Sequence, residues 1–237
     1  MATLGVTEHV NFLITPPSSH FDGGIGITAC NFKNAAETLK EHSSSLDDVL
    51  PLCYLYRHTV ELFLKSVTFI LHKKYAIEFG GEFSLDRPGI KVRDRWVAME
   101  NTHNLSDLYV YFEALFDQCR ELLPSTTRWD LPGDIKQKIN LVSGTDPKST
   151  FFRYPKSGSE QQDKKKTKIQ KTDLDKAFAN PDKPARLVVM LDNNDNLIES
   201  YDLDADTLGK VQSALYDLCD FFYGIHAAFR YELTNGS

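Results

Sequence analysis

The chain has 237 residues, of which 41% are hydrophobic and 25% are charged, and its formal net charge is −6. This length is sufficient for a hydrophobic core in one or two domains, and the composition is typical of an ordinary globular protein. The acidic balance excludes a surface that binds polyanions throughout, so any contact with nucleic acid requires a local basic patch.

The four cysteines are widely spaced and form no C-x-x-C pair, which argues against a zinc site and against a disulfide framework. The first residues carry no basic stretch ahead of an apolar run, unlike a secretory signal. No apolar run reaches the roughly 18 residues that span a bilayer. We therefore expect a cytoplasmic protein with reduced thiols and with no metal, cofactor or membrane association.

Residues 1–29 mix Gly, Pro, Ser and Thr, and we expect them to form an irregular N-terminal arm. A helical domain is expected over residues 30–237. Its first element is a short amphipathic helix over about 30–45, and residues 43–48 then supply turn and capping side chains for the next helix.

The segment 50–72 is apolar around most of a helical circumference, which predicts a helix in the middle of a bundle. One narrow stripe of it is polar. Arg57, Glu61 and Lys65 recur every four residues, and His58 lies three residues before Glu61, so we expect all four on roughly one side. Burying these charges without partners would cost several kcal/mol each, so they must either pair or face a groove.

Two interpretations of this stripe remain open. In the first, Glu61 pairs with Arg57 or Lys65 and fixes the register of a core helix. In the second, Arg57, His58 and Lys65 line a groove that receives an anionic ligand. Exposure separates the two, because a ligand site must reach solvent and a structural pair need not.

After a charged loop with a short strand at 90–92, the spacing of Leu and aromatic residues predicts a helix that ends before Pro124. Asn101, Thr102 or Asn104 could cap it. His103 then lies at or just before the N-terminus of this helix, where anions are favoured.

A further short helix is predicted at 134–142, and an insertion follows over about 145–204. Its first part places Arg153 between Phe152 and Tyr154 in a loop bounded by prolines. Its second part is rich in lysine over 164–171. We interpret this part as a solvated, mobile loop, with a phosphate-binding patch as the alternative.

Residues 185–203 predict a β-hairpin, since apolar β-formers flank an N-N-D-N turn. An isolated hairpin is only marginally stable, so we expect it to lean on the helices. A long last helix is predicted over 206–233, capped by Asp206 or Thr207. The predicted fold is mainly all-α, an antiparallel helical bundle with a small β-hairpin inserted before the last helix.

Two motifs in this order resemble the HEPN domain family of helical bundles. They are L-Y-R-H-T-V-E-L-F-L-K-S-V at 55–67 and T-H-N-L-S-D-L-Y at 102–109, and D-P-K-S-T-F-F-R-Y-P at 146–155 is similar to a loop of one uncharacterised branch. The resemblance implies an antiparallel bundle and a homodimer. It also implies a link to RNA, since many HEPN proteins are metal-independent ribonucleases in toxin–antitoxin and phage-defence systems.

The R-x4–6-H motif that the family uses for catalysis is absent from this chain. If the chain is an enzyme, the expected catalytic residues are Arg57, His58 and His103, with a histidine moving the proton. Glu61 and Lys65, together with Arg153 and Tyr154 from the loop, would complete the binding network. The alternative is a non-catalytic HEPN module for dimerisation or for binding a cognate partner protein.

Overall fold

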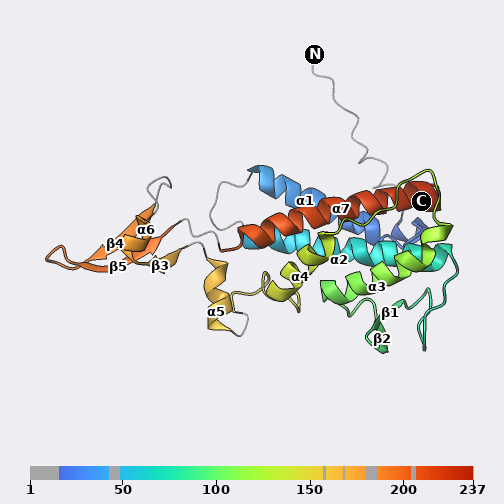
Figure 1. Ribbon diagram of the computed structural model, residues 1–237, viewed down its shortest axis with the longest axis horizontal. Helices are drawn as coiled ribbons and strands as arrows, with labels where there is room; N and C mark the ends of the chain where they lie inside the picture. Colours follow the sequence, from blue (N-terminus) through green and yellow to red (C-terminus); the bar gives the residue numbers. More distant parts are fainter. Residues whose placement is uncertain are drawn as a thin grey trace, which may run out of the picture.

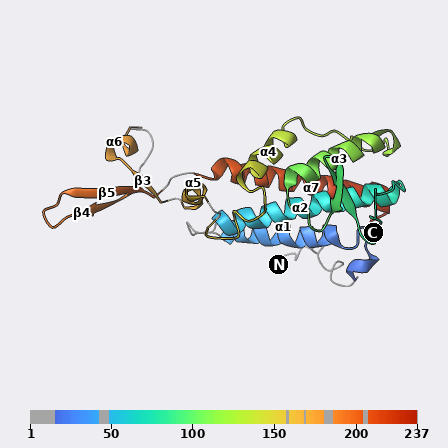
Figure 2. The ribbon, with the colours of Figure 1, turned by 90° about the horizontal axis from the view of Figure 1, so that it is seen from below.

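The computed structural model describes residues 16–42, 49–156, 159–167, 169–179, 186–203 and 207–236. The chain is mainly helical, with small antiparallel sheets, as predicted. The bundle consists of α1 (Ile25–His42), α2 (Val49–Lys74), α3 (Leu105–Cys119), α4 (Ile135–Thr145) and α7 (Gly209–Thr234). Figures 1 and 2 show these helices side by side in one elongated body.

Helix α2 is the centre of the bundle. It packs along α1 and α7, and α3 lies against it from another direction (Figure 2). Its side chains are buried almost without interruption from Thr59 to His72, apart from the half-buried Leu62. A helix that is apolar on most sides can be stabilised only where neighbours cover those sides. The prediction for 50–72 is therefore confirmed, with one or two more residues at each end.

Helix α1 begins at Ile25, earlier than predicted, because Asp22 caps it. The Asp22 carboxylate accepts hydrogen bonds from the backbone N–H groups of Gly24 (3.0 Å) and Gly26 (2.7 Å). Gly23 and Gly24 adopt positive φ angles of 68° and 85° in the turn before the helix. The short 3-10 turn η2 (Pro17–Ser19) precedes this turn. The remaining predictions for residues 1–15 and 43–48 lie outside the described residues.

A close approach of α1 to α7 requires glycine at position 26. A Cβ atom there would lie 1.9 Å from Nε2 of the buried His226. The same imidazole nitrogen lies 3.8 Å from Asp22 Oδ2, which also accepts a hydrogen bond of 2.5 Å from Ser66 Oγ. Asp22, Ser66 and His226, the Asp22 cluster, thus join the start of α1 to α2 and α7.

The prediction of a cap was confirmed for α3 and was wrong for α7. Asn104 caps α3, since its side chain accepts from the backbone N–H groups of Ser106 and Asp107, and the 3-10 turn η4 (Arg120–Leu122) follows the helix before Pro124. The prediction of Thr207 as the cap of α7 is wrong. Leu208 occupies that position, and Thr207 Oγ1 instead donates to the Lys165 carbonyl at 2.7 Å. Asp206 lies outside the described residues.

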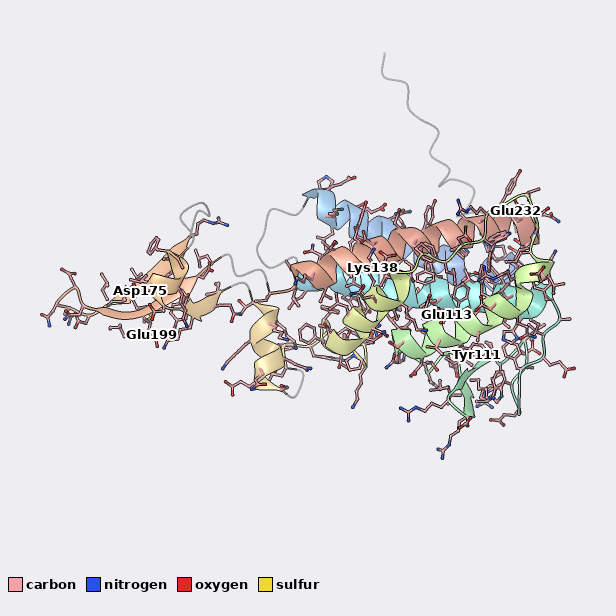
Figure 3. All side chains as sticks on the ribbon, in the orientation of Figure 1. Tyr111, Glu113, Lys138, Asp175, Glu199 and Glu232 are labelled. Carbon is pink, nitrogen blue, oxygen red and sulfur yellow. The ribbon has the colours of Figure 1, made fainter. Side chains whose placement is uncertain are left out.

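Charged side chains join α4 to its neighbours on the surface of the bundle. Lys138 Nζ lies 2.7 Å from Asp134 and 2.8 Å from Asp217, which connects α4 to α7. Lys136 pairs with Glu113 of α3 at 3.0 Å. Figure 3 shows Glu113 and Lys138 along this side of the bundle.

A short strand was predicted at 90–92 and is present as β1 (Gly89–Val92). It pairs with β2 (Arg95–Ala98), which was not predicted, in antiparallel register with Ile90 opposite Val97. Ile90 is fully buried against the bundle core, and it anchors this hairpin there.

The lysine-rich segment contains more structure than the predicted mobile loop. It forms α5 (Glu160–Asp163), η5 (Lys164–Lys166) and the strand β3 (Gln170–Thr172). Lys164, Lys166 and Lys171 pair with Glu160, Asp163 and Glu199, respectively. These carboxylates neutralise much of the local positive charge, which weakens the interpretation as a phosphate patch. Lys168 lies outside the described residues.

The predicted hairpin is present as β4 (Leu187–Leu191) and β5 (Leu197–Asp202), and Asp192 accepts from the turn N–H groups of Asn194 and Asn196. The expectation that it leans on the helices is wrong. It forms an antiparallel sheet in the order β3-β5-β4, accompanied by α6 (Leu174–Ala177). This projecting sheet extends away from the bundle (Figures 1 and 2). It can be stable without support from the helices because β3 adds a third strand to the hairpin.

The four cysteines are free thiols, and Cys53, Cys119 and Cys219 are buried, as expected for reduced core residues. Burial raises the pKa of Cys53 and of Cys219 to about 12. Among the described residues, no helix has the length and apolar character needed to cross a membrane.

Candidate functional site

Arg57, which we predicted as a catalytic or phosphate-binding residue, is fully buried and its guanidinium contacts protein atoms on every side. Nη1 donates to Glu61 Oε2 (3.1 Å) and to Ser149 Oγ (3.0 Å). Nη2 donates to the backbone carbonyls of His103 (2.6 Å) and Asp146 (3.3 Å). Nε lies 2.9 Å from Asp146 Oδ2. An arginine at 0% exposure with these contacts is out of reach of a phosphate in solvent.

Glu61 is the second centre of the same group. Its Oε1 accepts from Lys65 Nζ at 2.9 Å and lies 2.9 Å from His103 Nδ1, while Oε2 accepts from Arg57. Lys65 also approaches the Glu100 carbonyl at 3.4 Å and is only 6% exposed. The ion pairs predicted between Glu61 and its neighbours one turn away are therefore both made, and they are made out of water.

The loop after α4 completes the group. Asp146 accepts from the backbone N–H groups of Thr150 (2.7 Å) and Phe151 (3.0 Å) through Oδ1, and presents Oδ2 to Arg57. Ser149 adopts a left-handed conformation with φ of 58°, at which its hydroxyl reaches Arg57. A buried aspartate thus shapes the loop and neutralises the arginine at the same time.

We call Arg57, Glu61, Lys65 and Asp146, with the partly exposed His103 at their edge, the buried charge network. Two cations, Arg57 and Lys65, face two carboxylates, Glu61 and Asp146, so their formal charges cancel. Burying a balanced and hydrogen-bonded set avoids the large penalty of an isolated charge. The network joins α2 to the start of α3 and to the loop after α4, which are far apart in sequence.

His58 lies at the margin of the polar stripe, because the seven residues from His58 to Lys65 make about two helical turns and bring both side chains to nearly the same side of α2. Its ring contacts Phe32 of α1 edge-on, with centroids 4.5 Å apart, and stacks on Tyr54 at 5.9 Å. The half-buried imidazole therefore faces α1, and His103 faces Glu61.

Arg153 contacts both the surroundings of Arg57 and the Tyr54–His58 pair. Its Nε donates to the Ser149 carbonyl at 2.5 Å and its Nη2 to Ser149 Oγ at 2.8 Å, so it shares that hydroxyl with Arg57. Its guanidinium carbon lies 5.6 Å from the centre of the Tyr54 ring. The Tyr154 side chain, by contrast, is exposed; its backbone carbonyl accepts from Lys166 and its backbone N–H donates to the Thr150 carbonyl. Of the predicted binding residues, Arg153 therefore reaches the network and Tyr154 does not.

The environment shifts the pKa values of two groups in this region. Burial alone would raise the pKa of Glu61, but the charge and hydrogen bond of Lys65, the hydrogen bond of His103 and the charge of Arg57 outweigh it, so the pKa is below its ordinary value. Burial lowers the pKa of His58, and the cations Lys65, Arg153 and Arg57 add to this effect against the opposing charge of Glu61. Both shifts favour an ionised Glu61 and a neutral His58.

Asp146 and Ser149 are the members of this region that the sequence analysis missed. A stripe with two cations and one carboxylate is one negative charge short, and that imbalance is the signal that could have led to a buried aspartate elsewhere. Among the described residues, no group of His, Cys, Asp and Glu side chains could hold a metal ion.

Comparisons with known proteins find no matching family model, no matching curated protein and no matching solved structure.

Proposed function

We propose that this chain is a non-catalytic, HEPN-like helical module that associates with other protein chains through its projecting sheet. The observation that carries the proposal is the exposure of apolar side chains on β4 and β5. Six of them are 45–58% exposed: Val188, Val189, Met190, Leu191, Leu197 and Ile198. Successive side chains of a strand point to opposite faces, so both faces of this sheet carry exposed apolar groups, and such exposure on a part that stands away from the core is typical of an interaction site.

The burial of the charged stripe supports the non-catalytic part of this proposal. Arg57 and Lys65 are the groups that a phosphate would need, and both are held against carboxylates out of solvent. A general acid or base must come within hydrogen-bond reach of the substrate, and His58 and His103 point to different surroundings. Free thiols are consistent with a cytoplasmic location.

The helical framework supports a HEPN-like fold as part of the same proposal. The motif at 55–67 lies in the central helix α2, and the motif at 102–109 spans the cap and first turn of α3. The loop motif at 146–155 contributes Asp146 and Ser149, which bind Arg57 of the first motif. The three motifs of the resemblance thus meet in one buried network, which gives each of them a structural role.

RNA binding, with or without cleavage, is the second candidate function, and one observation favours it. Tyr54, His58 and Arg153 form a row of stacked rings and a guanidinium near the surface. Aromatic rings and arginine planes are the side chains on which unpaired bases stack. This candidate requires His58 or the partly exposed His103 to act on the RNA, without phosphate contacts from Arg57.

Photo-crosslinking tests the association proposal. A benzoylphenylalanine residue at Val188, on the projecting sheet, is expected to give protein adducts of discrete mass when cells that express the full chain are irradiated. The same residue at Val110 is the matched control, since Val110 is slightly more exposed (54% against 47%) but lies on α3 of the bundle. Adducts several-fold stronger at 188 support the proposal. Equal yields at the two positions, or none at 188, overturn it.

A further inference from the structure

The two edges of the projecting sheet differ in how they are protected. The order β3-β5-β4 leaves β3 and β4 as the outer strands, and within the described part of the chain β4 has a strand neighbour on one side only. The β3 edge is three residues long and reads Gln-Lys-Thr. The β4 edge reads Leu-Val-Val-Met-Leu and contains no proline and no charge. Natural proteins protect strand edges with short length, lysine or proline, so β3 is protected and β4 is not.

The backbone of β4 determines which residues face the open edge. The Arg186 carbonyl accepts from Leu203 N–H at 2.9 Å, and Asp192 N–H donates to the Asn196 carbonyl at 2.9 Å. The even-numbered residues therefore direct their backbone groups to β5. Because these directions alternate along an extended chain, Leu187, Val189 and Leu191 direct theirs to the open side.

The sequence of this edge is complementary to itself. If Val189 lies opposite Val189 of a second antiparallel copy, then Leu187 lies opposite Leu191 and Val188 opposite Met190. Arg186 and Asp192, which flank the strand, then also lie opposite each other, and this places unlike charges together at both ends. In this register the pairs Val189–Val189 and Leu187–Leu191 consist of the residues whose N–H and C=O groups point outward. About six hydrogen bonds form between the copies.

We propose that β4 pairs with β4 of a second copy of this chain, in antiparallel register about Val189, to give a continuous six-stranded sheet. This inference rests on the proposed function, in which the projecting sheet is the association surface, and it names the partner. The β-bulge of the hairpin does not interrupt the pairing edge, because the extra residue, Ile198, lies on β5. The sheet stands away from the helical bundle (Figure 1), so a strand that pairs with β4 would add to the part of the chain farthest from the helices.

A cysteine crosslink tests the register. In a hydrogen-bonded antiparallel pair the Cα atoms lie about 5.5 Å apart, within the roughly 4.4–6.8 Å that a disulfide spans. Val189→Cys is therefore expected to form a covalent dimer under mild oxidation. Ile198→Cys is the matched control, because it is more exposed (58% against 45%) but lies on β5, about three strand spacings or roughly 14 Å from its equivalent. The wild-type chain measures the background from its own thiols.

Light scattering on purified protein gives the second readout. Wild type is expected to have the mass of a dimer at high concentration, and Val189→Pro that of a monomer. Proline removes an N–H that faces the open edge, so pairing with β5 is kept. A monomeric wild type, or equal crosslinking of Val189→Cys and Ile198→Cys, overturns self-pairing. If photo-adducts at 188 then contain a different protein, the association function stands while the self-pairing is wrong.

Discussion

Arg57→Met is expected to lower the free energy of unfolding by about 3–5 kcal/mol, the range for breaking a buried ion pair by removing one partner. Methionine fills much of the same volume but leaves the Glu61 and Asp146 carboxylates short of their shared cation. It also leaves the backbone carbonyls of His103 and Asp146 without donors. Urea unfolding at neutral pH, followed by circular dichroism, measures the change.

Arg87→Met is the matched control, because Arg87 pairs with Glu82 at a similar distance of 3.1 Å, but with both side chains more than half exposed. An exposed pair contributes no more than about 1 kcal/mol. If Arg57→Met does not fold, His103→Ala supplies the comparison. His103 contacts the same Glu61 but is 45% exposed, so its loss is expected to cost about 1 kcal/mol or less. An effect of Arg57→Met no larger than that of Arg87→Met would contradict a structural role for the network.

Asp22→Ala is expected to lower the free energy of unfolding by about 2–4 kcal/mol at neutral pH, since it removes several hydrogen bonds to a buried charged acceptor. Asp22 caps α1, accepts from Ser66 Oγ and lies beside His226. Asp86→Ala, on an exposed loop, is the control and is expected to change stability very little. The difference between the two variants measures the Asp22 cluster.

The effect of Asp22→Ala should depend on pH in a defined direction. Burial alone would raise the pKa of Asp22, but His226, Ser66 and the Gly26 N–H outweigh it and hold the pKa well below its ordinary value. A carboxyl whose pKa is lowered by folding contributes fully above its unfolded pKa, about 3.9, and loses this contribution as pH falls through the folded value. The stability gap between wild type and Asp22→Ala should therefore narrow below about pH 4. A gap that widens in acid would contradict this assignment.

The helical framework could be predicted because its signals are local. Helical spacing of apolar residues located α2 and α3 and most of α7, and the Asn-rich turn located the β4–β5 hairpin. The pairing of Glu61 with residues one turn away also follows from spacing alone. Even the requirement that the stripe be neutralised follows from the cost of burying charge.

The contacts between these elements could not be predicted, because each contact joins segments that are far apart in sequence. Asp146 lies 89 residues after Arg57, and no spacing rule connects the two. The side of α2 that carries His58 follows from its spacing to Glu61, but the contact of its ring with Phe32 does not, because Phe32 lies on a separate helix. The hairpin was expected to pack on the bundle because two strands alone are marginal, but β3 was hidden in a lysine-rich segment that resembles a loop.

Incubation with RNA tests most directly the claim that the charged residues of α2 hold the fold and do not perform a reaction. The full chain is mixed with an end-labelled RNA pool in EDTA, beside His58→Ala and His103→Ala variants whose unfolding has been checked. The account predicts no cleavage above the level of buffer alone. Cleavage by wild type that is lost in either folded variant would contradict it, and would make the surface around His58 or His103 the site of a metal-independent ribonuclease.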